Sequence, residues 1–163
     1  MEDLVHMVEV HGLLPDNQFI LQPGRTTMDS LHFITKFVNN AWRRHEVISA
    51  LFLDIKAAFP SIVIDHLMHV MRMRGVPPQY TSVVKHIADS RQTVLKFDSY
   101  KSVPLDLSRG LNQGCPLSGI TFQFYNAGLL KVHRTDNGKD VISFMDDGLM
   151  LACGKTLHEM ESK

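Results

Sequence analysis

The chain is poor in cysteine, carries no net charge and has no long apolar run. Two cysteines in 163 residues cannot form a disulfide framework, which excludes a small disulfide-rich secreted domain. No stretch approaches the roughly 18 consecutive apolar residues that a transmembrane helix needs. The acidic start, residues 1–4, lacks a signal-peptide pattern. We therefore expect a soluble, intracellular protein that is not secreted and has no membrane partner.

The balance of charge disfavours a stand-alone nucleic-acid-binding domain, because such domains are usually basic. Seventeen basic residues are matched by seventeen acidic ones. The charges are unevenly spread, however, and residues 25–109 carry twelve bases and seven acids. That segment either faces phosphates or forms ordinary solvated helix faces, and charge alone favours the second interpretation.

Hydrophobic periodicity predicts alternating helices and strands, which favours a mixed α and β fold. A helix is expected from about residue 26, with a buried stripe that includes Leu31 and Trp42. A continuous apolar run predicts a buried strand over residues 47–54. The remaining predicted elements are helices over residues 4–11, 65–74, 78–87 and 116–130, and hairpins over residues 92–107 and 141–152.

Three aspartates stand where predicted strands end. Asp54 closes the apolar run 47–54, and Asp146 and Asp147 lie at the tip of the second predicted hairpin. If the two strands are neighbours, Asp54 and Asp146 converge. Converging carboxylates repel unless a hard cation joins them, and Mg²⁺ is often held by one or two carboxylates together with substrate phosphates. Taken alone, the Asp-Asp pair is better explained as a solvated turn.

A glycine-containing loop, residues 110–115, precedes the helix predicted from Pro116. Gly110 and Gly114 would let the backbone come close to a ligand, and a helix N-terminus favours anions such as phosphate. An ordinary connection between a strand and a helix explains the same residues equally well.

Three segments together resemble the palm motifs of reverse transcriptases, and more narrowly those of non-LTR, LINE-like retrotransposons. They are residues 52–59 (FLDIKAAF), 113–118 (QGCPLS) and 144–147 (FMDD), in the order and at the spacing of that family. Residues 17–19, 23–31, 96–98 and 124–127 extend the resemblance over nearly the whole chain.

This resemblance implies an α+β fold, namely a reverse-transcriptase palm in which a small antiparallel sheet is backed by helices, with part of the fingers. Residues 1–163 would form a partial domain, with fingers-side helices over residues 1–45 and the palm over residues 46–163. The thumb of the family would be absent.

The resemblance also assigns metal-binding roles. Asp54, Asp146 and Asp147 would be catalytic and would hold two Mg²⁺ ions, for which Mn²⁺ is a possible substitute. Asp54 and Asp146 are the expected direct ligands, with Asp147 in support. The backbone carbonyl of Ile55 would be a further metal contact.

Four more residues match nucleotide-binding positions of the family. Phe59 would stack under the incoming sugar and exclude a 2′-hydroxyl, because a rigid ring fills the space of the extra oxygen. Gln113 would contact the incoming nucleotide, and Gly114 would let the strand approach. Arg25 would meet phosphate or the template backbone.

The implied activity is that of an RNA-directed DNA polymerase, with an RNA template, a DNA primer and a deoxynucleotide (dNTP) as partners. The primer 3′-hydroxyl would attack the α-phosphate, and pyrophosphate would leave. We expect weak or no activity from the isolated chain, as a truncated or remnant copy whose thumb and endonuclease portions belong to a longer polyprotein. Its compartment would be the nucleus or the cytoplasm.

Two alternatives remain open. The chain could be a catalytically inactive retroelement fragment that at most binds nucleic acid. It could also be a nuclease or another two-metal phosphoryl-transfer enzyme, which would share the carboxylates but gives no reason for Phe59 or for the Gln113 loop.

Overall fold

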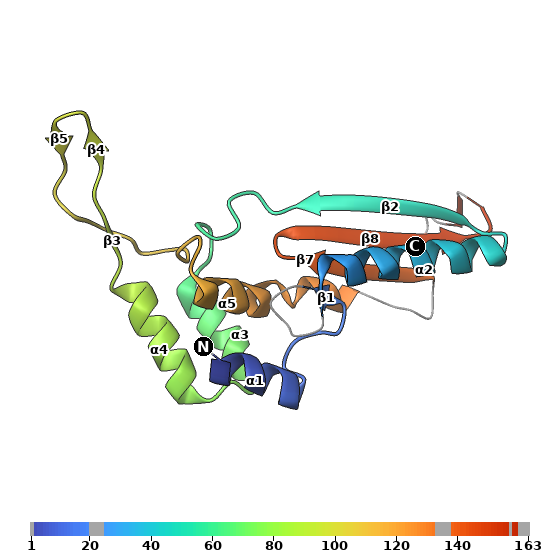
Figure 1. Cartoon of the computed structure of the whole chain (residues 1–163), viewed down its shortest axis with the longest axis horizontal. Helices are drawn as coiled ribbons and strands as arrows, with labels where there is room; N and C mark the ends of the chain where they lie inside the picture. Colours follow the sequence, from blue (N-terminus) through green and yellow to red (C-terminus); the bar gives the residue numbers. More distant parts are fainter. Residues whose placement is uncertain (1, 20–24, 133–137, 157, 160–163) are drawn as a thin grey trace. The chain divides into compact units, whose positions relative to one another are not determined.

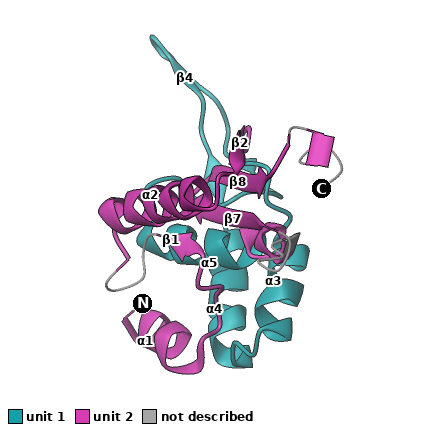
Figure 2. Cartoon of the chain, turned by 90° about the vertical axis from the view of Figure 1, so that its right-hand side faces the viewer, with its two compact units in different colours: residues 1, 57–125 teal, residues 2–56, 126–163 magenta. Residues whose placement is uncertain are grey.

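The computed structural model describes residues 2–19, 25–132, 138–156 and 158–159, and Figure 1 draws its helices and strands. The chain forms two compact units, which Figure 2 colours separately. One unit contains residues 2–56 and 126–163, and the other contains residues 57–125. Among the described residues, no helix combines the length and the apolar character that crossing a bilayer requires.

A four-stranded sheet with the order β1-β7-β8-β2 is the centre of the first unit (Figure 1). Strands β7 and β8 form a hairpin, and β2 pairs antiparallel with β8 along its whole length. Only the short β1 is parallel to its neighbour. The bounds of the strands are Gln18–Phe19 (β1), Val47–Asp54 (β2), Lys139–Phe144 (β7) and Asp147–Gly154 (β8). The sheet is therefore mixed, but its aspartate-bearing strands are antiparallel neighbours, as expected.

Helix α2 (Thr27–Arg43) lies along one face of this sheet and closes the core. The Thr26 hydroxyl accepts the Asp29 backbone N–H at 3.3 Å, and the Asp29 carboxylate accepts the Thr26 backbone N–H at 2.7 Å, so a capping box begins the helix. The Thr26 hydroxyl also donates to the Asp29 carboxylate at 2.6 Å, and this bond, together with the one from the Thr26 backbone N–H, lowers the pKa of the Asp29 carboxyl. The core residues that meet between α2 and the sheet are Phe19, Phe33, Ile34, Phe37, Ile142, Phe144, Leu149 and Leu151.

The prediction that residues 47–54 form a buried strand is wrong in its burial. Strand β2 is at the edge of the sheet and is largely exposed, and 77% of the surface of Phe52 is accessible. Burial is greater in the strands farther from this edge, such as β7, in which Val141, Ile142 and Ser143 are all buried. An apolar run alone does not distinguish an edge strand from a central one.

The predicted stripe of α2 is also wrong at both ends. Leu31 is exposed, and Trp42 is 64% exposed rather than packed at the helix end. Between these two ends the stripe is packed: Ile34 and Phe37 contact the core of the sheet, and Ala41 is fully buried.

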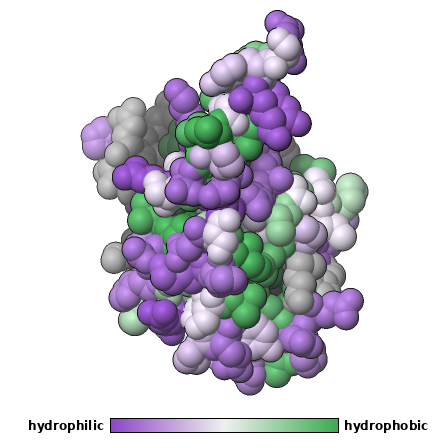
Figure 3. Space-filling view, turned by 90° about the vertical axis from the view of Figure 1, so that its left-hand side faces the viewer, coloured by the Kyte–Doolittle hydropathy of each residue, from purple (hydrophilic) through white to green (hydrophobic). Residues whose placement is uncertain are grey.

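Helices and a β-ribbon make up the second unit. Helices α3 and α4 pack together through residues such as Leu67 and Met71 of α3 and Val84 of α4, which are buried. The ribbon, residues 92–106, stands away from these helices in Figure 1, and in Figure 3 its surface is mostly hydrophilic with some hydrophobic surface near the tip. The bounds are Ile64–Met73 (α3), Pro78–Asp89 (α4), Gln92–Thr93 (β3), Lys96–Phe97 (β4), Tyr100–Lys101 (β5) and Leu105–Asp106 (β6).

Helix α5 (Pro116–Asn126) begins where predicted but ends sooner. The chain continues in a short 3₁₀ helix, η1 (Leu129–Val132), after Gly128. Glycine is a poor helix former, which accounts for the early end. The remaining helix, α1 (Glu2–His11), precedes β1 and buries Leu4 and Val8.

Gly110 makes a close backbone contact that fixes the loop before α5. Its φ is +85°, and a Cβ there would lie 2.8 Å from both the Cα and the carbonyl oxygen of Pro60. The Gly110 N–H donates to the Ile62 carbonyl at 2.8 Å, and the Leu111 N–H donates to the Phe59 carbonyl at 2.8 Å. Only glycine fits this position.

We expect Gly110→Ala to lower the free energy of unfolding by about 2–4 kcal/mol, because the new methyl group meets backbone atoms and disfavours the positive φ. Urea denaturation measures this change. Gly114→Ala is the matched control, since Gly114 also has a positive φ (+86°) but open space around a Cβ. Equal losses in the two variants would contradict the role given to the Pro60 contact.

Candidate functional site

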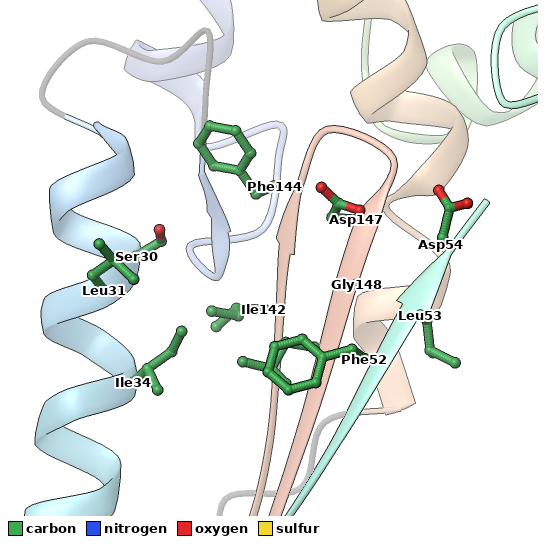
Figure 4. A pocket seen from close by; sticks show the side chains of 11 residues that line it. Ser30, Leu31, Ile34, Phe52, Leu53, Asp54, Ile142, Phe144, Asp147 and Gly148 are labelled. Atoms are coloured by element: carbon green, nitrogen blue, oxygen red, sulfur yellow. The ribbon is translucent and has the colours of Figure 1, made fainter.

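Asp54 and Asp147 are directly paired on adjacent strands of the sheet. Asp54 is the last residue of β2, Asp147 is the first of β8, and the register pairs them directly. Paired residues of antiparallel strands project to the same face, and Figure 4 draws both carboxylates at the same end of the sheet. Both residues are exposed, and within the described ranges neither forms an ion pair with a basic side chain. The arrangement is a concentrated negative charge that a cation would relieve.

Asp146 lies in the two-residue turn between β7 and β8, together with Met145. The φ of Met145 is +60°, the left-handed region that tight hairpin turns use. The Asp146 carbonyl accepts the backbone N–H of Ile55 at 3.2 Å, which ties the turn to the end of β2. The structure thus gathers all three aspartates and Ile55 at one edge, with Asp147 opposite Asp54. That Asp146 rather than Asp147 is the direct ligand stays a prediction.

Two buried polar side chains, Asn126 and Ser143, hold this turn by hydrogen bonds. The Asn126 side-chain amide donates to Ser143 Oγ at 3.1 Å and to the Met145 carbonyl at 3.4 Å, and Ser143 Oγ donates to the same carbonyl at 3.2 Å. Buried hydrogen-bonded groups hold one arrangement because breaking them leaves unsatisfied atoms. Asn126 lies in a segment that resembles the family, but the sequence analysis gave Ser143 no role. The feature that could have indicated Ser143 is a single hydroxyl side chain within the apolar strand that precedes the aspartates.

The two facing aspartates also line one end of a pocket of about 450 Å³ between α2 and the sheet (Figure 4). Its other walls are mainly apolar and include Ile34, Phe52 and Phe144. The sequence analysis gave these wall residues no role at the site. A pocket with carboxylates at its mouth and apolar walls can accept a ligand that joins a cationic or metal-bound group to a flat or hydrocarbon body.

In the second unit, the structure brings Phe59 and the Gln113 loop together. The Phe59 ring is half-buried and stacks on Phe122, with the ring centroids 5.0 Å apart. The backbone bond between Leu111 and Phe59 fastens the loop to the same segment. Gln113 and Gly114 follow in that loop and are exposed. The packed ring of Phe59 and the exposed Gln113 loop are therefore held by the same chain segment.

Arg91 is a second residue that the sequence analysis missed. Its guanidinium donates to the carbonyls of Arg109 (2.6 Å) and Gly110, and to Asn112 Oδ1 at 3.1 Å, while Nε donates to the carbonyl of Ala88 at 3.2 Å. It joins the C-terminal end of α4 to the start of the Gln113 loop. No spacing in the sequence indicates this role, because it depends on carbonyl groups that the fold brings together.

The first turn of α5 favours negative charge. The backbone N–H of Ser118 lowers the pKa of the Cys115 thiol by bonding its sulfur. A lowered thiol pKa is the direction that free N–H groups at a helix N-terminus produce.

Arg25 precedes the cap of α2 and forms an ion pair with Asp16, 2.9 Å from Nη2 to Oδ1. The structure brings it into the same unit as the three aspartates, and it brings Phe59, Gln113 and Gly114 into the other unit. Residues 20–24, which hold the Pro-Gly pair before Arg25, lie outside the described residues. In the described part of the chain, no group of three or more histidine, cysteine or acidic side chains is arranged to hold a metal ion by itself.

The amino-acid sequence matches the family described as reverse transcriptase (RNA-dependent DNA polymerase) over residues 1–161. Two similar proteins of Drosophila melanogaster are named probable RNA-directed DNA polymerases, from transposons X-element and BS. Each is 26% identical, over 88% and 85% of this chain and 16% of the relative. The transposon TX1 uncharacterized 149 kDa protein of Xenopus laevis is 30% identical over 64% of this chain and 8% of its own length. This chain thus spans less than a fifth of these relatives.

A solved structure of similar fold is apo telomerase from Candida tropicalis, truncated from its C-terminal domain. The TM-score is 0.67 at 10% sequence identity, and the likeness covers 98% of this chain and 34% of that one. An identity this low supports the fold alone. With its ordered motifs and its paired aspartate strands, this chain belongs to the reverse transcriptase family, is of the non-LTR, LINE-like type, and has an α+β, palm-like fold.

Proposed function

We propose that this chain forms the catalytic part of an RNA-directed DNA polymerase, which adds a deoxynucleotide to a DNA primer paired with an RNA template. The observation that carries the proposal is the pairing of Asp54 with Asp147 at the end of the sheet, next to the turn that holds Asp146. Residues 1–45 would be the fingers side and residues 46–163 the palm.

The carboxylates fit a magnesium site by their chemistry. Mg²⁺ prefers oxygen ligands and commonly takes only one or two carboxylates from the protein, the remainder coming from water and substrate phosphates. Asp54 and Asp147 offer such a pair without a competing basic group among the described residues. Asp54, Asp146 and Asp147, with the Ile55 carbonyl, would hold two ions, and Mn²⁺ could replace Mg²⁺. When bound, the ions would neutralise charge on the phosphate oxygens and favour ionisation of the primer hydroxyl.

Phe59 and the Gln113 loop would position the nucleotide. Because Phe59 is held by its stack on Phe122, its ring cannot yield easily to a larger sugar, which supports its proposed discrimination against a 2′-hydroxyl. Gln113 would contact the nucleotide from a loop that Arg91 holds in place. Gly114 presents no side chain and leaves open space beside the loop backbone. Positioning of this kind supplies much of the rate enhancement in phosphoryl transfer.

Arg25 would bind phosphate or the template backbone. Its present partner, Asp16, is fully exposed, and exposed ion pairs contribute about 0–1 kcal/mol. Exchange of that carboxylate for a phosphate is therefore energetically easy.

The chain spans 16% of the two Drosophila relatives, so we propose that an efficient polymerase needs further segments, including a thumb that grips the duplex. The 163 residues alone would extend primers weakly or not at all. The metal-binding step can be measured separately and does not require a thumb.

We expect Asp54→Asn and Asp147→Asn each to lower the rate of primer extension ~100-fold or more, because each removes a negative charge from the proposed metal site. Single-nucleotide extension on a preannealed RNA–DNA hairpin, with enzyme in excess and Mg²⁺ or Mn²⁺ present, measures that rate. Mn²⁺ binding, followed by water proton relaxation, should weaken in both variants.

Asp3→Asn is the matched control, since Asp3 is exposed on α1 and belongs to no proposed site. Undiminished Mn²⁺ binding or primer extension in Asp54→Asn or Asp147→Asn would contradict the assignment. Primer cleavage instead of extension would favour a nuclease. Template binding without Mn²⁺ binding would favour an inactive nucleic-acid-binding fragment.

We also expect Ser143→Ala to weaken Mn²⁺ binding while every aspartate stays in place, because the turn that holds Asp146 loses its support. The free energy of unfolding should fall by about 1–3 kcal/mol, the usual cost of leaving buried groups unsatisfied. Urea denaturation measures the loss of stability, and amide hydrogen exchange over residues 145–147 measures how well the turn is ordered. Ser49→Ala, on exposed strand β2, should change neither. Equal exchange rates in the two variants would show that Ser143 does not order the turn.

A further inference from the structure

The hairpin β4–β5 at the end of the ribbon exposes two aromatic rings that the fold does not use. Phe97 is 65% exposed and Tyr100 is 61% exposed, although both are large enough to anchor a core. The ribbon is held by its own bonds, such as the Ser102 N–H to the Leu95 carbonyl at 2.9 Å and the Gln92 side-chain amide to Asp106 at 2.8 Å. The two rings contribute to no buried core of the described residues, and most of their surface is accessible to a ligand.

The register separates the rings from two lysines. Phe97 pairs with Tyr100, and Lys96 pairs with Lys101. Because neighbouring residues of a strand point to opposite faces, the rings occupy one face of the hairpin and the lysines the other. Like charges directly opposite each other destabilise a sheet. Within the described residues, neither lysine forms an ion pair with a carboxylate.

The acidic groups of the ribbon do not cancel this positive charge. Asp106 lies at the far end from the turn and accepts the bond from Gln92. Asp98 lies in the turn, at a φ of +50°, and is not ion-paired with Lys96 or Lys101. The lysine pair is therefore a cationic site that an anion between the two side chains would stabilise.

We propose that the β4–β5 hairpin docks a single-stranded nucleic acid, with bases stacked on Phe97 and Tyr100 and phosphates neutralised by Lys96 and Lys101. Exposed aromatic rings on an element that also carries basic side chains can bind single strands without strong sequence preference, since every base has a face to stack. Lysine side chains are long enough to reach around a two-stranded ribbon toward a strand that lies on its other face. A duplex keeps its bases stacked inside and cannot use the rings.

The identity of that strand as RNA template rests on the proposed function, whereas the binding itself does not. A purely apolar protein surface would bury the rings but would leave the two lysines facing each other uncompensated. Charge complementarity therefore favours a nucleic acid as the occupant.

Binding of a fluorescent oligouridylate of about 12 nucleotides, a length within the usual site size, tests the proposal by anisotropy. The full chain is used in buffer without divalent metal, so that the aspartates do not contribute. We expect the double variant Phe97→Ala/Tyr100→Ala to bind at least 10-fold more weakly. Phe97→Leu/Tyr100→Leu should weaken binding similarly, because leucine keeps the apolar area but cannot stack.

Lys96→Ala/Lys101→Ala should reduce the slope of log K against log salt concentration by about 1.4, the value for two phosphate contacts on a single strand. Two controls match these changes. Trp42→Ala removes an equally exposed ring elsewhere, and Lys36→Ala/Lys131→Ala removes two other exposed lysines. Both controls should bind as the unaltered chain does.

Unaltered binding in the ring variants, equal losses in the controls, or a preference for duplex RNA would overturn the proposal. Self-association that alanine abolishes and leucine preserves, with oligouridylate binding unchanged, would instead assign the hairpin to a second copy of the chain. Retained binding by Asp147→Asn would support a hairpin that acts apart from the carboxylates. The docking proposal and the polymerase proposal can therefore fail separately.

Discussion

The pairing of β2 with β8 is the constraint on which the site depends. Because side chains alternate along a strand, a slip of one residue would carry Asp54 to the opposite face of the sheet. The observed register keeps Asp54 with Asp147 and Phe52 with Leu149 on the face that α2 covers. The bond from Ile55 to the turn extends this pairing beyond the last residue of β2. Backbone pairing, rather than contact between the aspartates, thus sets the geometry of the charged groups.

The second unit positions its residues by a different kind of contact. Gly110, Leu111 and Arg91 fix the loop before α5 through backbone carbonyl groups, and the ring stack fixes Phe59. Such contacts are short and directional, and they tolerate little change in the backbone. The carboxylates and the proposed nucleotide contacts are therefore each held by local supports of their own unit.

The sequence predicts the positions of the helices and both hairpins, because caps, periodicity and turn residues are local signals, although it places the end of α5 too late. The convergence of the aspartates was conditional on their strands being neighbours, and the register shows that they are. The order of the three motifs also indicates the family. The burial of β2 was predicted wrongly, since an apolar run does not reveal its position in a sheet. Ser143 and Arg91 escaped prediction for a related reason. Their partners are carbonyl and amide groups that only the folded chain brings near, and no residue type or spacing announces such a partner.

The exposed edge of strand β2 has a consequence for the solubility of the chain. Its outer edge presents a row of backbone amide and carbonyl groups, and its eight residues, VISALFLD, hold no proline and one charge. Such an edge is a template on which strands of other molecules can add, the first step of aggregation. The charge, Asp54, stands at the end of the strand. The carboxylate proposed to bind metal therefore also acts as a gatekeeper, and chemistry and solubility depend on the same side chain.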